Sequence, residues 1–161
     1  MSKSITCVDV NGETHDFSVD DLKWRPSTYG VVIKDDKILL SKQFGDKYDL
    51  PGGGVELNEK LEDSVIREVK EETGINVKSP KFLGVENNFF CDSHAEGEVF
   101  NSILIYYLCE FVGGELSTDG FDEWEKQYAE LAEWIPLGRL DEIKPASTID
   151  YRPYVKKALG L

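Results

Sequence analysis

Two glutamates one helical turn apart are the residues whose types and spacing most clearly suggest chemistry. On a helical wheel of about 100° per residue, Leu61, Val65 and Val69 fall within an arc of roughly 80°, and this arc must face a core. Glu72 falls inside that arc, and Glu68 lies beside it. The desolvation of two carboxylates at such a position costs several kcal/mol unless a partner neutralises them.

Two kinds of partner would satisfy this pair of carboxylates. One is a basic side chain: Arg67 is adjacent in sequence, whereas Lys70 points to the opposite side of the helix. The other is a divalent cation, because converging hard oxygen ligands suit Mg²⁺ or Mn²⁺ and leave coordination positions for water and a substrate phosphate. Helix geometry alone leaves both alternatives open.

The elements that must position these acids can be read from the flanking residues. The spacing predicts a helix from about Glu59 to Thr73, with Asn58 as its N-cap and Gly74 as its C-terminal cap. Before it lies the run Gly52-Gly53-Gly54, where glycine allows the backbone to approach a ligand closely or to present a carbonyl group. The alternative is an ordinary flexible turn, and the glycines by themselves favour that simpler interpretation.

The stretch from Gly53 to Ile75 resembles the Nudix box, G-x5-E-x7-R-E-U-x-E-E-x-G-U with U aliphatic, at every specified position. The flanking run Leu50-Pro51-Gly52-Gly53 is similar to the usual lead-in of that family, and Glu133 to Leu137 is similar to its late strand. The resemblance covers roughly Thr28 to Leu140. It implies an α/β fold, the Nudix-type α/β/α sandwich with a mixed β-sheet.

By position, the resemblance implies that Glu68 and Glu72 are the principal metal ligands, with the backbone carbonyl of Gly52 as a third. It also implies that Glu71 is a further ligand or orients the attacking water. Glu59 would occupy a supporting position, and Arg67 would hold the carboxylates through a salt bridge.

The activity implied by the resemblance is Mg²⁺- or Mn²⁺-dependent hydrolysis of the pyrophosphate bond in a small molecule, a nucleoside diphosphate linked to another moiety. The alternative is a protein of the same fold that senses a nucleotide or metabolite without cleaving it. The presence of all the box acids favours the hydrolase. Sequence alone does not identify the nucleotide.

Residues outside the box are weaker candidates. Family members often recruit a further acid from a late loop, and Glu130 is favoured here because it begins a strand. Phe89 and Tyr106 are candidates for stacking on a base, although aromatic residues at strand spacing usually pack in a core. The other late-loop acids considered are Asp122, Glu123 and Glu125, and the other aromatic candidates are Phe90 and Tyr107.

The remaining pattern predicts one domain, 1–161, with an N-terminal hairpin extension (1–27), a core (28–140) and a C-terminal helix (141–161). The hairpin spans Ser4 to Ser18 around Asn11-Gly12 and either extends the sheet or forms a homodimer contact. The further expected elements are a hairpin of Thr28 to Lys34 and Lys37 to Lys42, strands at Lys81 to Phe90, Val99 to Val112 and Glu130 to Ile135, and a helix from Tyr151 to Leu159.

Composition limits the possible partners. Acidic residues outnumber basic ones by 31 to 18, and the net charge of −13 argues against nucleic acid or an anionic membrane as a partner. The three cysteines form no C-x-x-C pair, which argues against a disulfide framework or a thiolate zinc site. Neither a signal peptide nor a membrane-spanning run is evident, so we expect a soluble cytoplasmic protein.

Overall fold

The computed structural model describes residues 3–92 and 97–160, which form a large sheet with few helices. The strands are β1 (Ser4–Val8), β2 (Thr14–Ser18), β3 (Leu22–Lys34), β4 (Lys37–Gln43), β5 (Lys47–Asp49), β6 (Gly52–Gly54), β7 (Ile75–Asp92), β8 (Glu98–Gly114), β9 (Ala129–Pro136) and β10 (Lys144–Pro145). The helices are α1 (Leu61–Thr73), α2 (Glu125–Tyr128) and α3 (Arg152–Ala158), with 3₁₀ turns at Val19–Asp21 and Leu137–Glu142.

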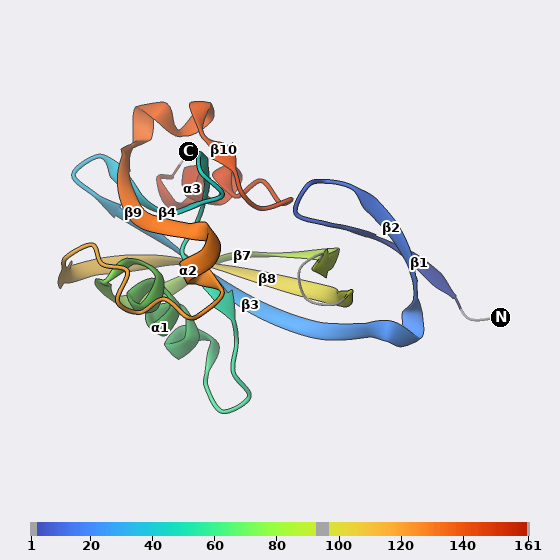
Figure 1. Cartoon of the computed structure of the whole chain (residues 1–161). Coiled ribbons are helices and arrows are strands. Elements are labelled where there is room, and N and C mark those ends of the chain that lie inside the picture. Colours follow the sequence, from blue (N-terminus) through green and yellow to red (C-terminus); the bar gives the residue numbers. More distant parts are fainter. Residues whose placement is uncertain (1–2, 93–96, 161) are drawn as a thin grey trace.

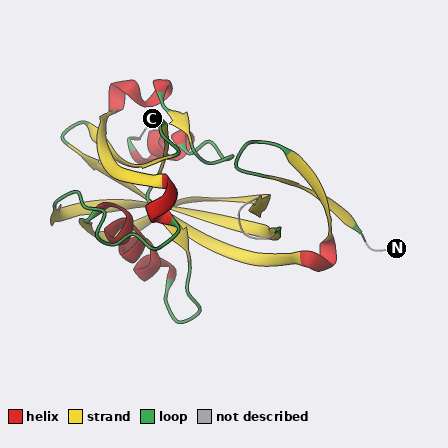
Figure 2. Cartoon of the chain, viewed as in Figure 1, coloured by secondary structure: helices red, strands yellow, loops and turns green. Residues whose placement is uncertain are grey.

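The sheet is mixed, as the sequence predicts. Its strand order is β10-β5-β4-β3-β8-β7-β1-β2, with β6 also paired to β3 and β9 to β4. The central pair β3 and β8 is parallel from Leu22 opposite Val99 to Val32 opposite Cys109, whereas β7 and β4 join it antiparallel. Figure 2 shows these strands as the dominant part of the fold, with the helices at its margins.

Successive residues of the central strands face opposite layers, because side chains alternate across a strand. On one face Val65 and Val69 of α1 pack against a cluster that includes Tyr107 of β8. On the other face Val155 of α3 packs against a cluster that includes Tyr106. Helices α1 and α3 therefore cover opposite sides of the sheet (Figure 1), and the predicted α/β/α sandwich is confirmed.

The start of α1 differs from the expectation. The helix begins at Leu61, and Asn58 is exposed, so the predicted Asn58 cap is wrong. Glu59 is held in the preceding loop because its carboxylate accepts hydrogen bonds from Arg67 at 2.6 Å and from the backbone of Glu56 at 2.9 Å. The other end is as predicted: Gly74 has a φ of 80°, and its N–H donates to the carbonyl of Lys70 at 2.9 Å.

The N-terminal hairpin extends the sheet. Strands β1 and β2 pair in regular register from Ser4 opposite Ser18 to Val8 opposite Thr14, and β1 lies next to β7. A small third core containing Cys7, Cys91 and Val99 anchors it. Figure 1 shows the hairpin as an arm that projects from the body of the molecule. The described pairing accounts for one of the two predicted roles of the hairpin, and a homodimer contact stays a prediction.

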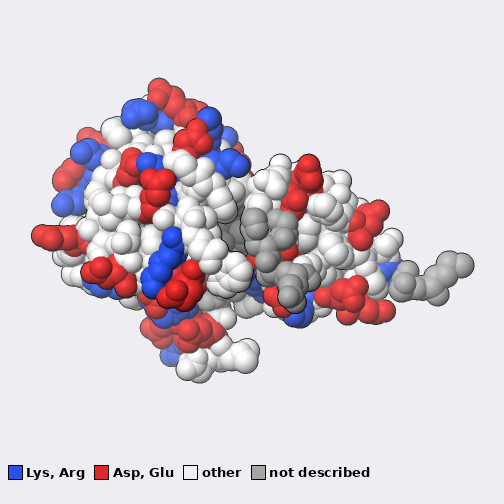
Figure 3. Space-filling view, viewed as in Figure 1, with Lys and Arg blue, Asp and Glu red and all other residues white. Residues whose placement is uncertain are grey.

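The surface carries both signs of charge. On the face in Figure 3, acidic side chains are spread over both the body and the arm, with Lys and Arg between them. All three cysteines are buried and free. Within residues 3–92 and 97–160, no helix has the length and apolar character needed to cross a membrane.

Candidate functional site

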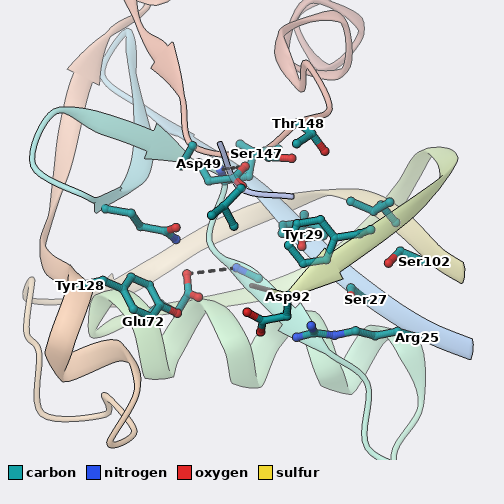
Figure 4. A pocket seen from close by; sticks show the side chains of 18 of the residues that line it. Arg25, Ser27, Tyr29, Asp49, Glu72, Asp92, Ser102, Tyr128, Ser147 and Thr148 are labelled. Carbon is teal, nitrogen blue, oxygen red and sulfur yellow. Dashed lines mark hydrogen bonds between the residues drawn. The ribbon is translucent and has the colours of Figure 1, made fainter. Parts of the chain in front are cut away.

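A pocket of about 580 Å³ opens beside the α1 carboxylates (Figure 4). Its wall brings together β3, the β4–β5 turn, the glycine run, the far end of β7 and the segment around α2. The acids in the wall are Asp49, Glu72, Asp92 and Asp122, and among the described lining residues Arg25 is the single Lys or Arg. The pocket is therefore acidic, and a polyphosphate would need added cations to bind there.

Glu72 reaches this pocket from the last turn of α1. Its Oε2 accepts hydrogen bonds from Ser41 Oγ at 2.6 Å and from the backbone N–H of Gly52 at 3.2 Å, the second of which is drawn in Figure 4. Burial raises the pKa of Glu72 well above its ordinary value, in spite of these two hydrogen bonds. In the described part of the chain, Glu72 forms no ion pair with Lys or Arg.

Glu68 lies one turn earlier and is 8% exposed. Its Oε1 accepts a hydrogen bond from Arg67 Nη1 at 2.8 Å, yet burial raises the pKa of Glu68 to about 7. A Cβ atom at Gly53 would lie 2.7 Å from Glu68 Oε2, closer than real Cβ contacts allow. The absence of a side chain at Gly53 therefore provides the room that the Glu68 carboxylate needs.

Arg67 organises the remaining acids of the helix. Its guanidinium donates to Glu59 at 2.6 Å, to Glu68 at 2.8 Å and to Glu71 at 2.9 Å, and it also donates to the carbonyl of Gly54 at 3.2 Å. These contacts lower the pKa of Glu59 to about 2, chiefly through the hydrogen bond from Arg67. One arginine therefore serves three carboxylates, and Glu72 is not among them.

The donor set fits a divalent cation. Glu72 is a half-buried carboxylate with no Lys or Arg partner among the described residues, and Glu68 Oε2 takes no hydrogen bond from Arg67. The peptide of Gly52, whose N–H donates to Glu72, also carries a carbonyl oxygen. All are hard oxygen donors, the type that Mg²⁺ and Mn²⁺ prefer. Of the two alternatives left by the helix geometry, arginine pairing thus accounts for Glu68, whereas Glu72 has no Lys or Arg partner in the described part of the chain.

A second group of metal-ligand atoms lies in the N-terminal arm. Ligand atoms of Asp9, Glu13 and His15 lie within 4.8 Å of one another, the one such group of three among the described residues. Asp9 accepts hydrogen bonds from the backbone of Asn11 at 2.8 Å and of Glu13 at 2.9 Å, and contacts His15 at 3.1 Å. These contacts explain Asp9 as the acceptor that closes the hairpin turn.

Comparison with known proteins identifies the domain. The NUDIX domain family matches residues 24–157, a range that contains α1 and β4 to β10. The chain belongs to the NUDIX domain family. The solved NUDIX hydrolase from Nitrosomonas europaea superimposes with a TM-score of 0.65 at 18% identity, over 86% of this chain and 90% of that chain, so the NUDIX fold is shared.

Two relatives show what this NUDIX domain is similar to in sequence. A stretch of 106 residues is 40% identical to an ADP-ribose pyrophosphatase of Methanocaldococcus jannaschii and covers 63% of this chain and 59% of that protein. A stretch of 129 residues is 33% identical to an NAD-capped RNA hydrolase, NudC, of Vibrio atlanticus and covers 77% of this chain and 42% of that protein. The chain thus spans less than two thirds of the length of either relative.

Among the late-loop acids of this NUDIX domain, Glu125 is the one that faces Glu72. The two carboxyl groups lie within hydrogen-bonding reach of each other, and burial raises the pKa of Glu125. Glu130, favoured from sequence, lines a small recess beside them but pairs with Lys42 at 3.2 Å. The sequence signal that could have selected Glu125 is its spacing from Asp122. The side chain of each accepts a hydrogen bond from the backbone N–H of the other, at 2.7 Å and 2.8 Å, and these bonds close the turn that leads into α2.

The two aromatic candidates pack away from the pocket. Tyr106 is buried and stacks between Tyr154, with ring centroids 4.1 Å apart, and Tyr29 at 5.6 Å. Phe89 packs in the core below the N-terminal arm. Its neighbour Phe90 lines the pocket instead, because consecutive strand residues point to opposite faces.

The pocket of the NUDIX domain also contains residues that sequence reasoning missed. Arg25 and Asp49 come from β3 and β5, and Tyr128 ends α2. Tyr128 stacks on Phe44 with ring centroids 4.9 Å apart, which closes the side of the pocket next to Glu72. None of these residues belongs to a contiguous motif, and only the pairing of distant strands brings them together.

Proposed function

We propose that this NUDIX domain is a metal-dependent hydrolase of the pyrophosphate bond in a nucleoside diphosphate derivative. The observation that carries the proposal is Glu72, a half-buried carboxylate in the pocket wall that pairs with no Lys or Arg of the described residues. The names of the relatives, an ADP-ribose pyrophosphatase and an NAD-capped RNA hydrolase, support the same class of bond.

The side chains around the proposed metal site have separate tasks. Glu68, Glu72 and the carbonyl of Gly52 would hold the ion, which when bound neutralises phosphate oxygens and lowers the pKa of its water ligand. Ser41 fixes the rotamer of Glu72 by its 2.6 Å hydrogen bond. Arg67 restrains Glu68 and the more exposed Glu71, which in this proposal orients the attacking water and accepts its proton.

Glu125 is the late-loop acid that we assign to the same site. We expect Glu125→Gln to lower kcat by roughly 10- to 100-fold, since its carboxyl group contacts Glu72 and adds charge where cations bind. Glu130→Gln, which removes an acid paired with Lys42, is expected to change kcat less than about threefold. Steady-state kinetics of the two variants tests these assignments. A larger decrease in kcat in Glu130→Gln than in Glu125→Gln would assign Glu130, and not Glu125, to the site.

The direct test is an assay for phosphate, pyrophosphate or nucleoside monophosphate release over a panel of nucleoside diphosphate derivatives, with Mg²⁺, with Mn²⁺ and with excess EDTA. We expect cleavage of at least one compound with added metal and a fall of about a hundredfold or more with EDTA, because metal stabilisation of phosphoryl charge is worth several kcal/mol. Tight binding of a nucleotide without any cleavage would instead establish a sensor.

A further inference from the structure

Asp49 is a polar residue of the pocket that the proposed reaction does not use. It ends β5 and lines the same pocket as Glu72. Its one hydrogen bond within the described structure comes from the backbone N–H of the next residue, Leu50, at 2.8 Å to Oδ1. The other carboxylate oxygen has no partner in the described part of the chain.

Among the residues that the structure describes, no basic side chain pairs with this carboxylate. Arg25, the Lys or Arg that lines the pocket, lies on the far side of Tyr29 from Asp49 (Figure 4). Burial raises the pKa of Asp49 to about 7, and no cation acts against that rise. Partial desolvation of a carboxylate that pairs with no cation lowers the stability of the folded protein. A ligand that donates hydrogen bonds to Asp49 would offset this cost and would therefore be favoured there.

The wall next to Asp49 is polar and formed by the segment that follows β10. The N–H of Ala146 donates to the carbonyl of Tyr48 at 2.8 Å, which places this segment alongside β5. Ser147 and Thr148 line the pocket from it, and Thr148 Oγ1 accepts a hydrogen bond from Asn88 at 3.1 Å. Asp49 therefore lies at a polar end of the pocket, apart from the box carboxylates in Figure 4.

We propose that Asp49 is the specificity-determining residue for the base of the substrate and accepts a hydrogen bond from an exocyclic amino group of that base. The inference rests on the proposed function, which places the diphosphate beside Glu72. The ionised carboxylate accepts but does not donate, so an amino group pairs with it, whereas a keto oxygen at the same place would face its lone pairs. The substrate comparisons are made at about pH 8.5, above the raised pKa of Asp49, where the ionised form predominates. Adenine, guanine and cytosine carry such a group, and hypoxanthine and uracil lack it.

The test compares substrates that carry that amino group with counterparts that lack it: ADP-ribose against IDP-ribose, a GDP-sugar against the IDP-sugar, and a CDP-alcohol against the UDP-alcohol. In the pair that contains the best substrate, wild-type kcat/KM is expected to favour the amino compound by about 10- to 100-fold, since the competitor leaves the half-buried carboxylate of Asp49 without that hydrogen bond. Asp49→Asn offers an amide that also donates, so the ratio is expected to fall to near one or to reverse, mainly through KM.

The matched control is Asp36→Asn, the same change in the exposed turn between β3 and β4. In this variant the ratio of kcat/KM between the two members of each pair is expected to stay as in wild type. An unchanged ratio in Asp49→Asn, with kcat lowered equally for every substrate, would overturn the inference and place Asp49 at the reacting phosphates. A wild type that does not distinguish the members of any pair would overturn it as well.

A second measurement separates this inference from the proposed hydrolysis. Binding of AMP, IMP, GMP, CMP and UMP to wild type and to Asp49→Ala is followed by equilibrium titration in EDTA. Wild type is expected to bind an amino-bearing nucleotide at least about 10-fold more tightly than its counterpart without the amino group, and Asp49→Ala is expected to lose that difference. If this result is obtained although no compound is cleaved, the inference on base recognition is supported and the proposed hydrolase activity is rejected. Equal affinity of wild type for both members of each pair would reject the inference on base recognition, whether or not the protein hydrolyses any of the substrates.

Discussion

Replacing Glu72 with Gln is expected to lower kcat by about a hundredfold or more, because the amide keeps the shape of the side chain but supplies no charge to a bound cation. The hydrogen bond from Ser41 Oγ at 2.6 Å can still be made to the amide oxygen. The fold is expected to remain intact, since the change removes a half-buried carboxylate that no Lys or Arg in the described residues neutralises.

The measurement is steady-state hydrolysis of the best substrate across a titration of Mg²⁺, together with circular dichroism and thermal unfolding. Glu62→Gln is the matched control, because Glu62 lies on the same helix with its side chain exposed. That control is expected to be within about twofold of wild type in kcat and within about 0.5 kcal/mol in stability. Hydrolysis by Glu72→Gln within a few-fold of wild type would reject Glu72 as a metal ligand.

Replacing Arg67 with Met is expected to lower the free energy of unfolding by about 2–3 kcal/mol, besides reducing activity. The change leaves Glu59, Glu68 and Glu71 side by side without their shared cation, and breaking a buried pair from one side costs about 3–5 kcal/mol. The lower figure reflects the partial exposure of the site, since the side chain of Arg67 is 26% exposed and that of Glu71 44%.

Urea unfolding at pH 7 measures this loss, and Arg139→Met is the control. The pair of Arg139 and Glu142 is exposed on both sides, so that variant is expected to lose no more than about 0.5 kcal/mol. Adding Glu59→Gln to Arg67→Met should restore part of the stability, because one uncompensated carboxylate is removed. If Arg67→Met were as stable as Arg139→Met, the three ion pairs would be contributing little to the fold.

The sequence predicted the parts of the site that are local in the chain. Glu68 and Glu72 border the apolar stripe of α1 because helix geometry alone determines which residues share a face. The start of the helix could not be predicted in the same way. Asn58 has the intrinsic preference for a cap, but a tertiary contact of Arg67 with Glu59 holds the loop open until Leu61.

The rest of the pocket depends on pairings between distant strands. Arg25 lies on β3 and Tyr128 at the end of α2, both far from the box in sequence. Asp49 ends β5 just before the glycine run, but it belongs to no specified position of the box. Choosing between Phe89 and Phe90 required the register of β7, since a shift of one residue exchanges the core face for the pocket face. A single sequence shows that side chains alternate between the two faces of a strand, but it does not show which face lies toward the pocket.

The N-terminal arm makes the pocket depend on a part of the chain outside the matched family range. Val10, at the tip of this arm, contributes to the pocket wall, while Val8 forms the arm's one backbone pairing with β7. A compound that contacts Val10 would therefore also stabilise the packing of the arm against β7, because its binding free energy adds to the stability of the structure that binds it. Deleting the arm is therefore expected to weaken the affinity of the pocket for such a compound, although every acidic residue of α1 is unchanged.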